Sequence, residues 1–508
     1  MAGPLLDTAL EKSVLKEKEN PTMVSIRVGF ARSVTFGDRA TVKPLFLVLG
    51  IVLLLAGCGS SEDSGGGDEG GTEAVDLSGA QAAVQGEDLL LYTPSLTTQT
   101  YLLDGSDNVV HQWSSAYNAG QMAFLQDDGS ILRAASINDV APDNRFVAAY
   151  RDGHNTIFQI GGIIERISKD NEILWSFEYY GDDYAPHHVA TVMPNGNLLM
   201  PVWRYTSEED SIALGRDPEH VGSGGLWVDS IVEVRPTGSG GGEIVWEWRA
   251  SDHFVQDFDS TKANYGELAD HLGRIDINYG KGLNVPEDFM HVNSAFYIEE
   301  LDQIAFTSYH YSELWVIDHS TTTEEAAGST GGRYGRGGEL LYRWGNPSVY
   351  GRDDTGAFLL SAVHDPEWLG EDRHFIMYDN NTADPGRRLK GGNSMVVEIE
   401  PPMAPDGSYA LGDDGVYGPA QPVWTADLGV QASSVGTAQR LSGGRTLSCD
   451  CTSSEAIWVD AKGAVVATAA VWENTVKDAD LTQVFRLASY PKDYAGVLAL
   501  SPSGEDHP

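Results

Sequence analysis

The chain has 508 residues and a formal net charge of −41, from 74 acidic and 33 basic side chains. Such an acidic surface repels nucleic acid and anionic membrane surfaces, so we expect no nucleic-acid partner. The length is sufficient for one large hydrophobic core or two ordinary ones.

Residues 45–55 form an apolar run that is too short to span a bilayer comfortably and is closed by small residues. It is typical of the core of a signal peptide, although the stretch before it is longer than a normal leader and points to a start at Met23 or later. The following residues, Leu55 to Cys58, match the lipobox of bacterial lipoproteins, whose cysteine receives the lipid; the alternative is an ordinary transmembrane anchor. We predict that residues 1–58 are an N-terminal extension and lipoprotein signal peptide, with lipidation at Cys58.

The mature protein is therefore expected in the cell envelope, outside the cytoplasm on the periplasmic or extracellular side, and held to a membrane through its lipid only. Residues 59–88 are rich in glycine, serine and acid and predict a flexible tether. Residues 89–500 are rich in Trp, Tyr, Val and Ile between turn residues and predict a globular β-rich body. Residues 501–508 are expected to be a disordered tail.

Two kinds of hairpin alternate along this body. The first kind joins an apolar strand through a polar turn to a second strand that carries tryptophan in most copies, at residues 101–113, 163–177, 231–248, 314–344, 395–424 and 457–466. The second kind has a glycine or acidic turn, at residues 121–132, 188–199, 291–306, 364–377 and 437–447, with a looser copy at 484–498. Two hairpins give four strands, which is the unit of a propeller blade.

Six such units at a period of about 60 to 70 residues predict an all-β, six-bladed β-propeller with long inter-strand loops. Two stacked β-sandwiches are the alternative architecture, but they do not explain the strict alternation. Because the chain begins with one kind of hairpin and ends with the other, its first and last segments are expected to pair in one blade.

Three histidines occupy nearly the same position of the second hairpin: His188, His291 and His364. Equivalent positions of innermost strands converge on the central channel of a propeller, so these side chains should face one another. The other two well-defined copies place Gln121 and Gly436 there. Such a cluster is suited to holding a metal through imidazoles or to nucleophilic and acid-base work, and spacing alone does not separate the two; a structural polar channel is the third interpretation.

Apart from Cys58, the only cysteines are Cys449 and Cys451, which point to one face of a strand. They either form a local disulfide or stay as thiols, and without further cysteines no zinc site is expected there.

At these residues the sequence resembles the arylsulfotransferase family, which moves a sulfuryl group between phenols without a nucleotide donor. The resemblance covers about 89–498 and is most specific at residues 188–197, 246–253, 289–294, 313–319, 342–347, 364–365, 379–380 and 438–441. It implies a six-bladed propeller without a cofactor, small-molecule aryl sulfate and phenol substrates, and a ping-pong mechanism. In that mechanism His364 matches the sulfurylated nucleophile. His291 and His188 match the residues that hold sulfate oxygens and manage protons, and His187 is the less favoured neighbour of His188.

One position departs from the family pattern. An arginine is expected on the strand after the second histidine, where its charge would offset that of the sulfuryl group, but Tyr309 stands at or beside that place. We predict that Tyr309, His310 and Asn293 bind substrate. Compensation is expected from His310 or from a loop arginine, with three candidates: Arg333, Arg336 and Arg352. Otherwise the protein has a different substrate or is a non-catalytic envelope propeller that binds a ligand or partner.

Overall fold

The computed structural model describes residues 88–153, 158–279, 287–352, 358–382, 391–471 and 483–500. The predicted signal peptide, the lipidation site Cys58, the tether up to residue 87 and the tail 501–508 lie outside these residues. Within the described ranges, no helix is long and apolar enough to cross a membrane.

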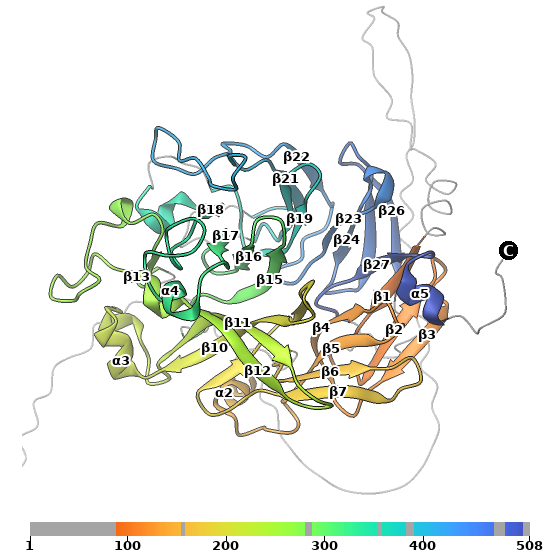
Figure 1. Cartoon of the computed structure of the whole chain (residues 1–508). Coiled ribbons are helices and arrows are strands. Elements are labelled where there is room, and N and C mark those ends of the chain that lie inside the picture. The colour runs from red at the N-terminus through yellow and green to blue at the C-terminus, as the bar shows by residue number, and fades with distance from the viewer. Residues whose placement is uncertain are drawn as a thin grey trace, which may run out of the picture. The chain divides into compact units, whose positions relative to one another are not determined.

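The fold is a six-bladed β-propeller, as the sequence predicts (Figure 1). Each blade is an antiparallel sheet whose strands follow one another from the innermost outward. Blade 1 contains β27 (Ala488–Pro491), β1 (Asp88–Tyr92), β2 (Gln99–Leu103) and β3 (Val109–Ser114). Blade 2 contains β4 (Ala119–Leu125), β5 (Ile131–Ala135), β6 (Ile163–Ile167) and β7 (Ile173–Glu178). Blade 3 contains β8 (Tyr184–Pro186) and β9 (Thr191–Val192), both paired with β10 (Leu198–Thr206), then β11 (Leu226–Pro236) and β12 (Gly242–Arg249).

The second half of the chain repeats the same order. Blade 4 contains β15 (Val292–Ile298), β16 (Gln303–Ser308), β17 (Glu313–Asp318) and β18 (Tyr342–Trp344). Blade 5 contains β19 (Val363–Leu369), β20 (His374–Asp379), β21 (Met395–Ile399) and β22 (Trp424–Asp427). Blade 6 contains β23 (Ala438–Arg440), β24 (Thr446–Asp450), β25 (Glu455–Val459) and β26 (Val465–Ala470).

The two ends of the propeller pair in blade 1. Strand β27 is antiparallel to β1, with Leu89 opposite Tyr490 and Leu91 opposite Ala488. The expected closure is therefore confirmed, but residues 484–498 do not form a hairpin. Only β27 comes from that segment, and helix α5 (Ala495–Leu500) follows it. The partner strand is β1, which removes the open edge that two unpaired ends would leave.

The hydrophobic core lies between neighbouring blades, because each sheet buries both of its faces. Leu102 and Trp113 of blade 1, for example, pack with Ile131 and Ile167 of blade 2, and all four side chains are fully buried. At the other side of blade 1, a second cluster contains Leu103 of this blade and Leu447 of blade 6. Burial of this kind stabilises each large apolar side chain by about 1.5–3 kcal/mol, which favours a closed ring.

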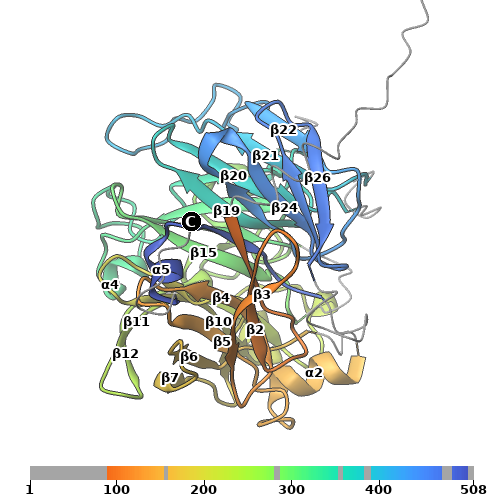
Figure 2. The same ribbon diagram turned by 90° about the vertical axis from the view of Figure 1, so that its right-hand side faces the viewer.

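The remaining elements lie in the loops between strands. The helices are α2 (Arg145–Gly153), α3 (Glu208–Ala213), α4 (Thr323–Ala326) and α5. Short 3₁₀ turns occupy Pro218–His220, Ala250–His253, Leu268–Asp270, Pro347–Tyr350 and Ser442–Gly444, and a parallel pair joins β13 (Phe254–Val255) to β14 (Ile275–Asp276). Figure 2 shows α2 on one face of the propeller and α4 and α5 on the opposite face.

Candidate active site

The repeated position at the entry of the innermost strands has an unusual backbone. The φ angles there are 123° at Gln121, 62° at His188, 52° at His291, 45° at Asp365 directly after His364, and 153° at Gly436. Strands β4, β15 and β19 each contain a register shift at this point. Left-handed backbone at a non-glycine residue costs on the order of 1–3 kcal/mol, and bulges redirect side chains. All five blades thus have a positive φ at or directly after this position, and four of the five residues are not glycine.

The three predicted histidines lie in one network of rings. The ring centroids of His188 and His291 are 4.7 Å apart. Phe485 joins His188 to His364, at 5.2 and 5.8 Å, and Tyr309 joins His291 to His364, at 5.4 and 5.5 Å. The side chains come from blades 3, 4 and 5 and from the segment before β27, so the closure of the ring completes the cluster.

The two ring nitrogens of His364 have different kinds of partner: acceptors at Nδ1 and a backbone donor at Nε2. Its Nδ1 lies 2.5 Å from the Oδ1 of Asn380 and 3.1 Å from the carbonyl of Ala362. Both partners are acceptors, so Nδ1 carries the proton and Nε2 carries the lone pair. Nε2 accepts a long hydrogen bond of 3.3 Å from the backbone N–H of Val435. Burial lowers the pKa of His364 to about 3, so the imidazole is neutral at physiological pH.

His291 is the member of the cluster whose pKa is raised rather than lowered. Its Nδ1 lies 2.5 Å from the Oδ2 of Asp288, which also accepts a 2.6 Å hydrogen bond from Tyr150 of α2. Burial would lower the pKa of His291, but the charge of Asp288 and its hydrogen bond with Nδ1 outweigh burial and leave that pKa raised above 6.5. Burial likewise opposes ionisation of Asp288, yet His291 and its other partners hold the pKa of this carboxyl at about 2. Each partner thus favours the charged form of the other.

His188 belongs to a buried row of side chains. Its Nδ1 lies 2.7 Å from the Nδ1 of His187, whose Nε2 lies 2.8 Å from the Oδ1 of Asp229. Trp203 stacks on His187 with centroids 4.1 Å apart. Burial lowers the pKa of His187 to about 3 and that of His188 well below 6.5, so both imidazoles are neutral. The ring of His188 contacts His291 and Phe485 of the cluster. His187 contacts the Nδ1 of His188 and links it to Asp229.

The three residues predicted to bind substrate lie around His291 and differ in their bonding. Tyr309 donates a 2.9 Å hydrogen bond to the carbonyl of Ser433, and His310 contacts the His291 ring at 5.5 Å. Asn293 is fully buried; its amide donates to the carbonyl of Val363 at 2.7 Å and its Oδ1 accepts from Thr307. These bonds tie β15 to the backbone before His364. They favour a positioning role for Asn293, and its binding role stays a prediction.

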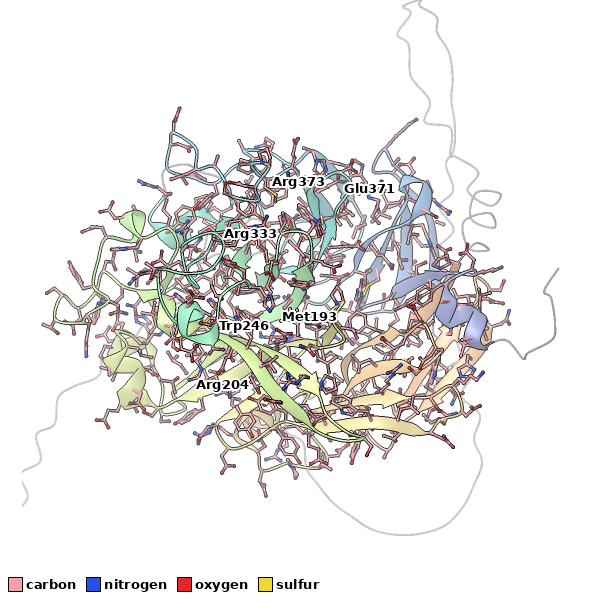
Figure 3. All side chains as sticks on the ribbon, in the orientation of Figure 1. Met193, Arg204, Trp246, Arg333, Glu371 and Arg373 are labelled. Atoms are coloured by element: carbon pink, nitrogen blue, oxygen red, sulfur yellow. A yellow bond between two sulfur atoms is a disulfide. The ribbon has the colours of Figure 1, made fainter. Side chains whose placement is uncertain are left out.

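The candidate loop arginines are engaged away from the histidines. Arg333 donates to the carbonyl of Leu301, Arg336 to the hydroxyl of Tyr417, and Arg352 to the carbonyl of Ala269. These contacts put the arginines on loops around blades 4 and 5 (Arg333 is labelled in Figure 3). None of these bonds supports their assignment as substitutes for the family arginine.

Four contributors to the cluster were not singled out from the sequence. They are Tyr150, Phe158, Asp229 and Phe485; Phe158 contacts the rings of His188 and His291 at 5.0 and 6.0 Å. Phe485 had a detectable signal, since it lies at the start of the sixth hairpin copy, where the blade repeat places a channel residue. Tyr150, Phe158 and Asp229 lie outside that repeated position, and no spacing relates them to it.

Cys449 and Cys451 form a disulfide, which decides between the two alternatives left by the sequence. The bridge is buried in the core between blades 6 and 1. In the described part of the chain, no group of three or more His, Cys, Asp and Glu is arranged to hold a metal ion.

A cavity of about 380 Å³ adjoins the histidine cluster. Val189, Asp365 and Arg486, the direct neighbours of His188, His364 and Phe485, line it, and so does Glu299, which directly follows β15. Met193, next to the lining residue Pro194, lies near the middle of the ring in Figure 3. Arg486 is paired with Asp365 at 2.9 Å, so this arginine is neutralised by a carboxylate of the cavity wall.

Comparison with known proteins gives one family match. Residues 175–393 match the family described as Arylsulfotransferase (ASST). This region contains His187, His188, Asp229, Asp288, His291, Tyr309, His364 and Asn380. No curated protein matches the chain.

The solved structures to which this chain is similar share little sequence identity with it. A protein of unknown function from Bacteroides caccae is 11% identical with a TM-score of 0.42, over 79% of this chain and 98% of that chain. A β-propeller domain from Myceliophteria thermophila is 9% identical with a TM-score of 0.38, over 80% and 94%. The periplasmic gluconolactonase of Pseudomonas aeruginosa is 11% identical with a TM-score of 0.34, over 79% and 98%. From the family match, residues 175–393 of this propeller are thus similar to the arylsulfotransferase family.

Proposed function

We propose that the protein transfers a sulfuryl group from an aryl sulfate to a phenol through a sulfohistidine at His364. In the first half-reaction Nε2 of His364 attacks sulfur, a nitrogen–sulfur bond forms, and the sulfur–oxygen bond to the aryl group breaks. The leaving phenolate takes a proton from a neighbouring histidine. In the second half-reaction a phenol loses its proton, its oxygen attacks sulfur, and the electron pair of the nitrogen–sulfur bond returns to Nε2.

The observation that carries this proposal is the bonding of His364. Asn380 and the Ala362 carbonyl both accept at Nδ1, at 2.5 and 3.1 Å, and so hold the tautomer whose lone pair is on Nε2. A pKa of about 3 keeps that lone pair free of a proton. Neutral imidazole is the nucleophilic form, and an intermediate formed on it divides one difficult transfer into two easier steps.

Val435 supplies a second element of the proposed site. Its N–H bonds Nε2 of His364 at 3.3 Å, and its φ of 58° places it in the left-handed region. When Nε2 bonds to sulfur, this N–H loses its acceptor beside the new sulfuryl group. We infer that it then donates to a sulfuryl oxygen, as preorganised backbone donors do for developing negative charge.

His291 is our candidate for the missing arginine. It is protonated through its 2.5 Å contact with Asp288 and lies between His188 and Tyr309, both of which contact its ring. A positive charge here would offset the sulfuryl oxygens, which is the role that Tyr309 cannot fill. In this proposal His291 keeps its proton, and His188 handles the proton of the phenol.

The test is pre-steady-state release of phenol. Protein mixed with 4-nitrophenyl sulfate and no acceptor should release up to one equivalent of 4-nitrophenolate, the burst expected of a covalent intermediate. His364→Ala should abolish the burst. His374→Ala is the matched control, because His374 lies on the next strand of the same blade, paired with Glu398 at 2.7 Å, and should retain it. A wild-type protein without a burst on several aryl sulfates would favour a non-catalytic, ligand-binding propeller.

We also propose that the propeller is anchored in the cell envelope through a lipid on Cys58. Support comes from the lipobox at residues 55–58 and the polar segment that follows it. The substrates would then be small phenols and aryl sulfates that reach the outer side of a membrane.

A further inference from the structure

Asp229, His187 and His188 form a row of hydrogen-bonded side chains, although a single histidine would be sufficient as a base. Asp229 lies on β11, whereas the two histidines lie between β8 and β9. The exposed fractions of the three residues are 0%, 1% and 1%. The contacts of 2.8 and 2.7 Å join the three groups in one line that ends in the histidine cluster.

The protons of this row can be arranged in two ways, and both histidines are neutral in each. If Asp229 carries a proton, it donates to Nε2 of His187, Nδ1 of His187 donates to Nδ1 of His188, and Nε2 of His188 presents an N–H. If Asp229 is ionised, every hydrogen bond reverses, and Nε2 of His188 presents a lone pair. Both imidazoles stay neutral in either arrangement.

We propose that Asp229 and His187 form a proton relay that lets His188 donate and accept the phenol proton without ever becoming an imidazolium. This inference rests on the proposed sulfuryl transfer. In the first half-reaction the leaving phenolate takes the proton from Nε2 of His188, and the row shifts until Asp229 is ionised. In the second half-reaction the acceptor phenol gives its proton to Nε2, and the row shifts back until Asp229 is protonated. The proton balance over one cycle is zero.

The surroundings of the row favour this arrangement over a charged histidine. Trp203 covers one face of His187, and the neighbouring His291 is already a cation that disfavours a second one. Burial and the negative charge of Asp288 raise the pKa of Asp229 well above 3.8, which suits a carboxyl that holds a proton. The other oxygen of Asp229 accepts the N–H of Val292 at 3.2 Å, so the carboxyl is fixed in place. His187 and Asp229 are positioning residues that act through His188.

The experiment uses Asp229→Asn, which keeps an oxygen for Val292 but cannot gain or lose the proton. With 4-nitrophenyl sulfate the leaving group needs no proton, so the burst should keep its wild-type rate. Return of the sulfuryl group to a phenol with a pKa near 10 should slow by about 10²–10⁴, while an acceptor that is already ionised should react normally. His187→Phe, which keeps the stack on Trp203, should show the same dependence on acceptor pKa. Equal slowing for ionised and neutral phenols would overturn the relay.

A second measurement needs no substrate and separates failure of the relay from failure of the proposed function. ¹⁵N NMR of labelled histidine should show neutral His188 change from the Nε2–H to the Nδ1–H tautomer as pH rises through the pKa of Asp229. In Asp229→Asn its tautomer should be the same at every pH. A wild-type His188 that keeps one tautomer, or that becomes an imidazolium, would contradict the relay whether or not the protein transfers sulfuryl groups.

Discussion

Replacing Asp288 by asparagine removes the carboxylate that holds His291 in its charged form. The two side chains are 2.5 Å apart, and Tyr150 bonds the same oxygen at 2.6 Å. Without this charge, burial dominates and the pKa of His291 should fall below 6.5. Each unit of that fall is about 1.4 kcal/mol of lost preference for the imidazolium.

The expected kinetic loss follows from the role of the cation. Removing one preorganised group that stabilises transition-state charge costs about 10²–10³ in rate, or ~2.7–4 kcal/mol. We therefore expect kcat/KM of Asp288→Asn at pH 7 to fall by this factor with an aryl sulfate. Asp302→Asn is the matched control, because Asp302 contacts His319 at 2.8 Å outside the cluster; it should leave the rate unchanged.

The pH profile provides the refutation. His291 has a raised pKa, so its charge is present at low pH and is lost as pH rises through the folded value; the wild-type rate should fall on the alkaline side, above 6.5. Because the pKa of His364 is about 3, its imidazole stays neutral between pH 5 and neutrality, where an ordinary histidine would titrate. We therefore expect no fall in rate from protonation of the nucleophile in that range. In Asp288→Asn the alkaline limb should move to lower pH. An unchanged limb with an unchanged rate would show that His291 is not the cation of the site.

Three further predictions concern the cation, the strained turn and the anchor. Tyr309→Arg should strengthen binding of an aryl sulfate, measured as a lower KM, if a missing positive charge limits that binding. Weaker binding by this variant would argue that residue 309 does not lie beside the sulfuryl group. Gly436→Ala should destabilise the fold by about 1–3 kcal/mol in denaturant unfolding. The φ of Gly436 is 153°, and a Cβ there would lie 2.3 Å from the ring of Tyr378. An unchanged unfolding midpoint would contradict this prediction. Cys58→Ser should move the protein from the membrane fraction to the soluble fraction, and retention in membranes would remove the lipid-anchor proposal.

The blades could be predicted because each strand pair leaves its own local pattern. All six predicted hairpins of the first kind, from residues 101–113 to 457–466, are pairs of outer strands in the structure. The sixth hairpin of the second kind fails for a topological reason. Its segment contributes only β27, and β1 supplies the second strand from the opposite end of the described chain. The alternation of hairpins predicts that the two ends share a blade, but not that β1 takes the place of the second strand of this hairpin.

The histidines could be predicted because the blade repeat aligns them, but their partners could not. Tyr150 reaches Asp288 from a helix 138 positions earlier, and Asp229 reaches His187 across 42 positions. Such contacts depend on how loops fold over one end of the propeller. Periodicity therefore locates the ring of imidazoles, and only tertiary packing determines which of them is charged.

The central claim is that His364 carries the sulfuryl group, and rapid-quench mass spectrometry tests it most directly. Protein mixed with an aryl sulfate, without acceptor, is quenched in base and digested. The account predicts one added SO₃ group on the peptide that contains His364, lost on addition of phenol and absent from His364→Ala. A modification on His188 or His291 instead, or release of phenol with no modified peptide, would contradict it.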